Sequence, residues 1–305
     1  MQTKSKATQF NATLEVFIRF LLLACLFIIS YQVFLKWLSF EAIVVTNYLC
    51  VCCATLLFPL NFWLEWKRFK WSVNQYEIPL TDQNKAFYQG IIVSFFTPAL
   101  IATTIGRLGI NTRIRNLQWM GAGVLSGLAQ FTVTMLFAFW GAMYLFGVHR
   151  IFVTFMFFSA GALSLISYFF KLKFPTCMSK WKLIRDFHAL PASQSKGQIL
   201  LLSILRYAVF SVQFHLLILG FGIPFDIKQI FILMLSYGLI TLSPSILFGK
   251  LVLRELIAVA VFSWFTYPKE EIMLAAFFTW GINVVLPVLF ALIRISSTWK
   301  ARFYL

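Results

Sequence analysis

Charged residues are scarce in this sequence. They make up 12% of its 305 residues, whereas soluble domains contain about 25%. Hydrophobic residues make up 60%, and the mean hydropathy is +0.83. Stretches 119–148 and 151–170 contain no charged residue at all. Apolar runs of about 18 or more residues are typical of transmembrane helices. The composition therefore excludes a soluble protein, and the continuity of the runs excludes the alternating pattern of a β-barrel.

The sequence also lacks the common catalytic and metal-binding motifs. It contains no Walker A loop, no H-E-x-x-H, no G-x-S-x-G and no aspartate-rich metal motif. The five cysteines form no disulfide framework, and the cluster Cys50 to Cys53 lacks a second pair of metal ligands. We therefore expect no enzyme activity, no cofactor and no metal site.

Lysine and arginine are the charged residues that the sequence does contain. They number 26 against 10 acidic residues, which gives a net charge of +16. They do not form a separate domain, so nucleic acid is not an expected partner. In membrane proteins they concentrate in cytoplasmic loops. The loop 171–196 carries Asp186 as its single acid, so we place this loop and the N-terminus in the cytoplasm.

The apolar segments predict an all-α polytopic membrane protein that forms a single integral membrane domain, 1–305. The apolar run 17–34 is too long for the core of a signal peptide, so we expect a retained first helix. We expect about seven or eight transmembrane helices plus one or two proline-broken re-entrant hairpins. The predicted segments are 14–35, 42–66, 87–108, 119–147, 151–170, 199–222, 230–248, 251–265 and 272–293.

Two of these segments contain proline in similar surroundings. One is FFTPALIATTIGRLGI with Pro98, and the other is TLSPSILFGKLVLREL with Pro244. If segment 87–108 crossed the membrane, Arg107 would lie outside and the loop 171–196 would emerge on the wrong side. A hairpin that enters and leaves on one face removes this conflict, because a proline break is tolerated where protein or water surrounds it. The alternative is an ordinary kinked crossing helix.

The second proline segment leaves two orientations open. If it re-enters from the opposite face, the halves 1–150 and 151–305 form an inverted repeat, and the C-terminus is expected outside. If it crosses, the C-terminus is inside. Helices broken at matching positions in two halves are the usual sequence indication of a transporter's midplane site.

Charges within apolar segments are costly, so each requires a partner or a cavity. Arg107 follows the first proline and could hold a lipid phosphate. Arg254 and Glu255 follow the second proline, and as neighbours on a helix they point in different directions. Asn61 and Glu65 share a helix face.

Other polar residues in these segments have simpler explanations. Arg206 is predicted to extend to the cytoplasmic interface. His215 is predicted to be packed and hydrogen-bonded rather than a proton carrier. Gln130 and Asn283 are expected to form hydrogen bonds between helices.

Four patches together resemble the flippase-like integral membrane domain of the lysylphosphatidylglycerol synthase family. They are NFWLEWK from Asn61 to Lys67, SFFTP through Arg107, Pro244 with Gly249, Arg254 and Glu255, and WGIN with Pro287. Where the family has Gly-Glu after the first proline, this sequence has Ala102-Thr103. Because the chain ends at Leu305, the resemblance does not imply the family's aminoacyl-transferase domain.

The resemblance implies translocation of a phospholipid or lipid-linked molecule between leaflets, with broken helices lining the path. It implies the plasma membrane, the inner membrane of bacteria, as location and anionic phospholipid as partner. The expected substrate-binding residues are Arg107, Arg254, Glu255, Asn61 and Glu65, with helix breaks at Pro98 and Pro244. Two alternatives are a membrane scaffold or accessory subunit that presents the basic loop 171–196, and a membrane-embedded lipid-modifying enzyme.

Overall fold

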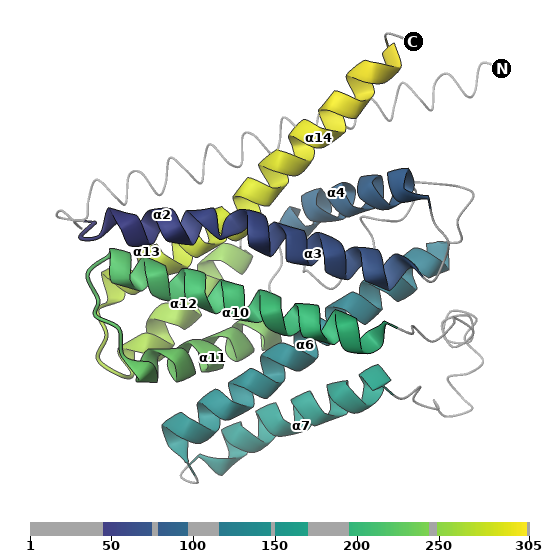
Figure 1. Cartoon of the computed structure of the whole chain (residues 1–305). Coiled ribbons are helices and arrows are strands. Elements are labelled where there is room, and N and C mark those ends of the chain that lie inside the picture. The colour runs from purple at the N-terminus through teal and green to yellow at the C-terminus, as the bar shows by residue number, and fades with distance from the viewer. Residues whose placement is uncertain are drawn as a thin grey trace. The chain divides into compact units, whose positions relative to one another are not determined.

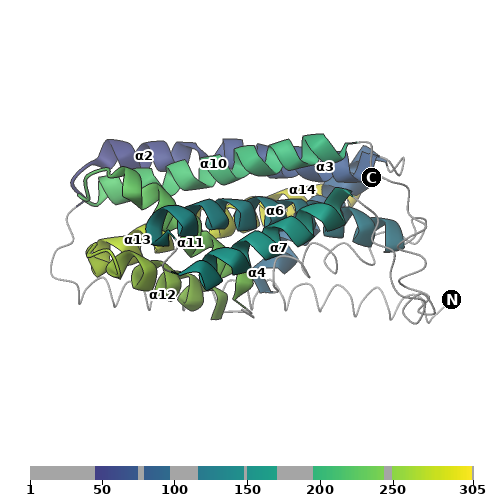
Figure 2. The ribbon, with the colours of Figure 1, turned by 90° about the horizontal axis from the view of Figure 1, so that it is seen from below.

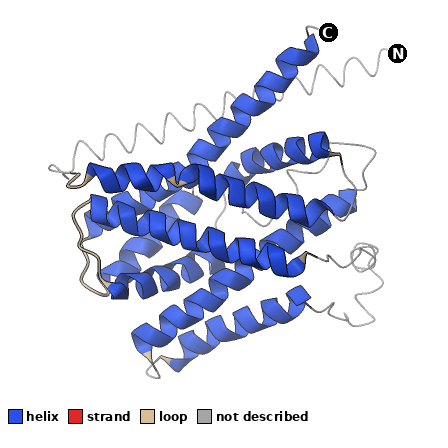
Figure 3. Cartoon of the chain, viewed as in Figure 1, coloured by secondary structure: helices blue, strands red, loops and turns tan. Residues whose placement is uncertain are grey.

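A computed structural model of the chain describes residues 45–74, 79–96, 116–147, 150–169, 195–243 and 249–303. The chain divides into two units, Met1–Val44 and Val45–Leu305, and all described residues belong to the second. The predicted helix 14–35 lies outside the described residues. Within those ranges every regular element is a helix and none is a strand (Figure 3).

Most described helices correspond to predicted apolar segments, but the second segment continues as helix to Val73 instead of ending at residue 66, and α4 begins at Leu80 instead of residue 87. Five helical segments are long and apolar enough to cross a membrane: Tyr48–Val73, Gly121–Phe146, Ile151–Phe169, Lys196–Gly220 and Lys269–Ile295. The all-helical membrane class is therefore confirmed, while the total number of crossings stays a prediction. The elements are α2 (Tyr48–Leu56), α3 (Phe58–Val73), α4 (Leu80–Phe96), α6 (Asn116–Phe146), α7 (Ile151–Phe169), α10 (Lys196–Gly220), α11 (Ile227–Leu242), α12 (Gly249–Ser263), α13 (Lys269–Trp280), the π-helix η2 (Gly281–Val285) and α14 (Leu286–Phe303) (Figure 1).

One end of the helix bundle carries Lys67, Lys70 and Lys196, and we call it the basic end. Here the last turns of α3 pack against the first halves of α4 and α6, through Phe69, Phe87 and Ala122. The last turn of α7 meets the first turn of α10, where the Tyr168 hydroxyl donates to the Lys196 carbonyl at 2.7 Å. Helices α4, α6 and α10 therefore all begin at the basic end, and α3 and α7 end there.

The opposite end of the bundle, which we call the far end, is where α2 begins and α10 ends. The Thr46 amide donates to the Gly220 carbonyl at 3.0 Å, and the Gln213 amide group donates to the Ala54 carbonyl at 3.0 Å. Helices α2 and α3 thus run antiparallel to α10. They lie alongside it in two perpendicular views (Figures 1 and 2).

Helices α11 and α12 pack against each other as a pair, and the outer ends of the pair meet. Asp226 caps the start of α11, and its carboxylate accepts a hydrogen bond from the Tyr267 hydroxyl, just after α12, at 2.7 Å. Beside it, Lys228 Nζ lies 4.7 Å from the centre of the Phe265 ring. With 16 and 15 residues, the helices are about 24 and 22 Å long, shorter than a membrane core of about 30 Å.

After this pair the chain returns along the bundle through α13, η2 and α14. The Phe221 ring at the far end lies 5.5 Å from Phe278 of α13, and the Phe62 ring of α3 lies 5.2 Å from Phe290 of α14. Helix α14 packs along α4 and runs toward the basic end (Figure 2). Asn283 lies within the π-helical turn, and such turns are frequent at functional sites.

Candidate functional site

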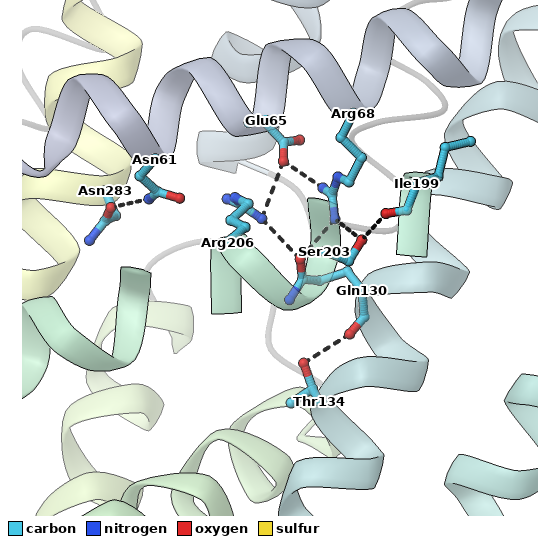
Figure 4. A network of polar contacts seen from close by, with 9 residues as sticks. All are labelled: Asn61, Glu65, Arg68, Gln130, Thr134, Ile199, Ser203, Arg206 and Asn283. Atoms are coloured by element: carbon cyan, nitrogen blue, oxygen red, sulfur yellow. Dashed lines mark hydrogen bonds and ion pairs between the residues drawn. The ribbon is translucent and has the colours of Figure 1, made fainter. Parts of the chain in front are cut away.

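The candidate site begins on one face of α3, next to α6 and α10. Asn61, Glu65 and Arg68 are spaced by four and three residues, so their side chains share this face. Arg68 is only 4% exposed and Asn61 also 4% exposed, although both are polar. Buried polar groups in an apolar bundle need partners, and Figure 4 shows where these side chains find them.

Glu65 forms two ion pairs, one within its own helix and one across to α10. Its carboxylate lies 2.5 Å from Arg68 Nη2 and 3.2 Å from Arg206 Nη1 (Figure 4). The prediction that Arg206 extends to the cytoplasmic interface is therefore wrong. Its side chain is 22% exposed, because it turns inward to the carboxylate of α3.

Helix α6 contributes Gln130 to the same network. Its side-chain oxygen accepts hydrogen bonds from Arg68 at 2.8 Å and from Arg206 at 3.4 Å. Ser203 of α10 accepts from Arg68 at 3.3 Å. The predicted role of Gln130 in bonding between helices is confirmed, and three helices meet at one pair of arginines (Figure 4).

Asn61 connects α3 to the π-helical turn. Its side-chain Nδ2 donates to the side-chain oxygen of Asn283, and Asn283 in turn donates to the Thr279 carbonyl at 3.0 Å. This contact confirms the predicted bonding of Asn283 between helices. The sequence resemblance had placed Asn61 and Asn283 in separate patches, and the fold brings them together.

Arg254 of α12 lies beside Phe210, an aromatic residue of α10. Its guanidinium carbon lies 5.5 Å from the centre of the Phe210 ring, and that of Arg206 lies 5.9 Å from the same ring. Among the described residues no carboxylate lies within ion-pair distance of Arg254. Glu255, its neighbour in the chain, is partly buried on α12.

Three predicted site residues lie outside the described residues: Arg107, Pro98 and Pro244. Their predicted roles stay predictions. Of the other predicted residues, the structure places Asn61 and Glu65 beside the arginines of α3 and α10. It places Arg254 beside the aromatic ring that Arg206 also contacts.

Arg68 is the site residue that sequence reasoning missed. It stands between Lys67 and Lys70, directly after the predicted segment 42–66, and such a run of basic residues is typical of a cytoplasmic loop. In the structure the two lysines lie over tryptophan rings, with Lys67 4.6 Å from Trp63, whereas Arg68 turns into the bundle. The spacing of Glu65 and Arg68 by three residues was the available signal.

We call Arg68, Arg206 and Arg254 the arginine cluster. Glu65 is the carboxylate that pairs with Arg68 and Arg206, and Arg254 lies beside the same Phe210 ring as Arg206. Guanidinium groups in apolar surroundings favour anions that they can bind through two parallel hydrogen bonds, above all phosphates and carboxylates. The arrangement can therefore hold an anion within the bundle.

The described residues include no group of side chains that could bind a metal ion. In the described ranges no three His, Cys, Asp or Glu side chains lie together as metal ligands. His215 is packed, and its Nδ1 lies 2.7 Å from the Ser211 carbonyl, as predicted for a hydrogen-bonded histidine.

Comparison with known proteins identifies no family. The sequence matches no protein-family model, and no curated protein matches it. The resemblance to the lysylphosphatidylglycerol synthase membrane domain therefore stays a prediction that depends on the four sequence patches alone.

Proposed function

We propose that the protein is a lipid translocase, which binds the headgroup of an anionic phospholipid at the arginine cluster and moves it between leaflets. The observation that carries the proposal is that three guanidinium groups gather between apolar helices and that two of them share a single carboxylate. Ionisable residues at such depth are costly and usually mark a substrate or ion pathway.

The positions of the helix ends support a re-entrant arrangement of the first proline segment. Helices α4 and α6 both begin at the basic end, so the chain that enters with α4 has returned to this end by Asn116. We therefore propose that the stretch 80–115 dips into the membrane and leaves on the same face. A full crossing would place the start of α6 at the far end.

The α11–α12 pair supports a second re-entrant hairpin, from the opposite face. Both helices are shorter than the membrane core, and their outer ends are joined at the far end through Asp226 and Tyr267. We propose that 227–263 is one hairpin, with α13 to α14 as the following crossing. The sequence-based prediction that leaves the C-terminus outside has the segment 230–248 re-enter alone, whereas here α11 and α12 form the hairpin together and only one crossing follows. The C-terminus then lies on the side of the basic end, in agreement with the charges of Lys300 and Arg302.

Two hairpins that enter from opposite faces correspond to an inverted repeat, the arrangement of many transporters. We place the basic end, with Lys67, Lys70 and Lys196, in the cytoplasm and the protein in the plasma membrane, the inner membrane of a bacterium. The resemblance to a flippase-like family points to the same function. A phosphate that crosses an apolar core requires cationic donors along its path, and the arginine cluster supplies them.

Leaflet exchange in proteoliposomes tests this function. Acyl-labelled fluorescent phosphatidylglycerol is placed in both leaflets, and dithionite bleaches only what reaches the outer leaflet. We expect the protein to accelerate exchange over empty vesicles, and Arg206→Gln to slow the exchange at least about tenfold, since a bidentate charged contact is lost.

The matched control is Arg150→Gln. Arg150 is exposed between α6 and α7, away from the network, so this variant is expected to keep the wild-type exchange rate. Glu255→Ala and Arg107→Ala extend the test to the predicted site residues. Exchange no faster than in empty vesicles, for a correctly folded wild-type protein, would remove the translocase and favour the scaffold that presents the loop 171–196.

A further inference from the structure

The two arginines that share Glu65 are held unequally. Arg68 donates to Glu65 at 2.5 Å, to Gln130 at 2.8 Å and to Ser203 at 3.3 Å. Arg206 reaches Glu65 at 3.2 Å and Gln130 at 3.4 Å, at the long limit for hydrogen bonds. The Arg68 side chain is 5% exposed, whereas the Arg206 side chain is 22% exposed. Arg68 is therefore fixed, and Arg206 is the arginine that can change partners.

Arg206 also has unused hydrogen-bonding capacity. Its Nε is buried and has no hydrogen-bond partner among the described residues. The Nε of Arg68 also lacks a partner, but both terminal nitrogens of Arg68 are already bonded, to Glu65, Gln130 and Ser203. A guanidinium group presents five N–H donors in a rigid fork, and a phosphate can accept two of them at once. Glu65 occupies only one terminal nitrogen of Arg206 in this structure.

Arg254 provides a second cation close to Arg206. Both guanidinium carbons lie within 6 Å of the same Phe210 ring centre, at 5.9 and 5.5 Å, and the two positive charges repel each other. In the described part of the chain Arg254 has no carboxylate partner. An anion that contacts both Arg206 and Arg254 would relieve their repulsion. The Glu65 carboxylate does not relieve it, because it is paired with Arg68.

We propose that Glu65 is an internal counter-ion, which a phosphodiester replaces at Arg206. In the ligand-free protein Glu65 is shared by Arg68 and Arg206. When the phosphate binds, it contacts Arg206 and Arg254, and Glu65 remains on Arg68. Glu65 is thus a positioning residue that competes with the ligand. This inference rests on the proposed function in one respect only, namely that the ligand is a lipid headgroup.

The test measures ligand affinity in the full-length protein in nanodiscs of zwitterionic lipid. The probes are short-chain dioctanoyl phosphatidylglycerol and, separately, inorganic phosphate. We expect Glu65→Gln to lower the apparent Kd of the anion about tenfold, because the competing charge is removed while the side-chain size is kept. Arg206→Gln is expected to raise the Kd by at least as much. Asp226→Asn, an exposed carboxylate at the far end, is the control and is expected to leave the Kd unchanged.

A second variant keeps the test decisive if Glu65→Gln does not fold. Arg206→Lys retains the charge and the pairing with Glu65 but loses the guanidinium fork, so we expect it to weaken phosphodiester binding about tenfold. The matched control is Arg150→Lys. An unchanged Kd in Glu65→Gln, or in Arg206→Lys where the first variant is unfolded, would overturn the counter-ion role.

The two probes separate the sources of the anion. A Glu65-dependent Kd for phosphatidylglycerol alone supports exchange with a lipid headgroup, and the same dependence for inorganic phosphate supports exchange with the free anion. Leaflet exchange on the same preparations separates this inference from the proposed function. Wild-type exchange with a Kd insensitive to Glu65 removes only the counter-ion role, whereas a Glu65-dependent Kd without any leaflet exchange removes only the translocase.

Discussion

Helix α6 contacts α11 through one kind of residue and contacts α3 and α10 through another. Against α11 it presents Gly141, where an added Cβ would lie 2.6 Å from the Phe231 carbonyl, and Tyr144 stacks on the Phe231 ring at 3.8 Å. Against α3 and α10 it presents Gln130, which accepts from two arginines. The first contact is specified by shape and leaves no room for change. The contact of α6 with α3 and α10 is specified by polar partners that can be exchanged. We therefore assign the proposed function to this contact and not to the one with α11.

The largest effect is expected from removal of the shared carboxylate. Glu65→Leu leaves Arg68 and Arg206 without their ion-pair partner, and we expect the free energy of unfolding in bicelles to fall by about 3 kcal/mol. The double variant Glu65→Leu with Arg68→Met should recover part of this loss, because the more deeply buried cation is gone as well. Equal losses in the single and the double variant would contradict the assignment of the penalty to a stranded buried charge.

The apolar contact is broken by adding volume. Gly141→Leu places a side chain against the α11 backbone, and we expect a loss of about 2 kcal/mol in the free energy of unfolding. Gly197, at the start of α10, is the matched control, because an added Cβ there meets nothing within 4 Å. If Gly141→Leu and Gly197→Leu are equally stable, then shape does not specify the α6–α11 contact.

A smaller effect is expected at the contact between α3 and the π-helical turn. A double-mutant cycle of Asn61→Leu and Asn283→Leu measures the coupling between the two amides. We expect a coupling free energy of about 1 kcal/mol, the usual size for a hydrogen bond between transmembrane helices. A coupling of zero would show that the two side chains contribute independently and that the amide pair does not hold the π-helical turn against α3.

The smallest effect is expected at the base of the α11–α12 pair, which lies outside the candidate spans. The hydrogen bond from Tyr267 lowers the pKa of Asp226, and burial, followed by Asp226, raises the pKa of Tyr267 to about 12. The Asp226 contribution to stability is present above the pKa of the unfolded carboxyl, about 4, and is lost as the pH falls through the lowered native value. The Tyr267 contribution is present below the unfolded pKa of about 10 and is lost as the pH rises through 12.

Tyr267→Phe is therefore expected to flatten both the acid and the alkaline decline of the melting temperature in detergent. Thr266→Ala, a change at the neighbouring exposed residue, serves as the control. Parallel melting curves for wild type and Tyr267→Phe between pH 2 and about pH 5 would contradict a stabilising role for this hydrogen bond.

Helix positions followed from the sequence because long uncharged runs have few other structures in a membrane. The predicted segment 151–170 corresponds to Ile151–Phe169, and 199–222 to Lys196–Gly220. Segments 230–248 and 251–265 were expected as separate elements, and the structure pairs them as α11 and α12. The short lengths of the two segments indicated that they could pair. The contact between Asp226 and Tyr267, which are 41 residues apart, is set only by the fold.

The candidate site was less predictable than the helices. Glu65 and Asn61 stood out because polar residues are rare in apolar runs. Arg206, the partner of Glu65 on α10, did not stand out in the sequence. It lies near a helix start, where arginine commonly extends to the interface. Whether an arginine at such a position extends to the interface or pairs inside the bundle depends on whether another helix places a carboxylate opposite it. No local sequence pattern shows how two distant helices face each other.

The central claim is that the arginine cluster recognises the phosphate-bearing headgroup of an anionic lipid. Its most direct test is the ratio of leaflet-exchange rates for acyl-labelled phosphatidylglycerol and phosphatidylcholine in one preparation. Both lipids carry a phosphodiester, but the choline ammonium of phosphatidylcholine adds a positive charge beside the arginine cluster. We therefore predict a ratio of about ten or more for the wild-type protein and for Arg150→Gln, and a ratio close to one for Arg206→Gln. A ratio that is the same in wild type and Arg206→Gln would contradict the claim.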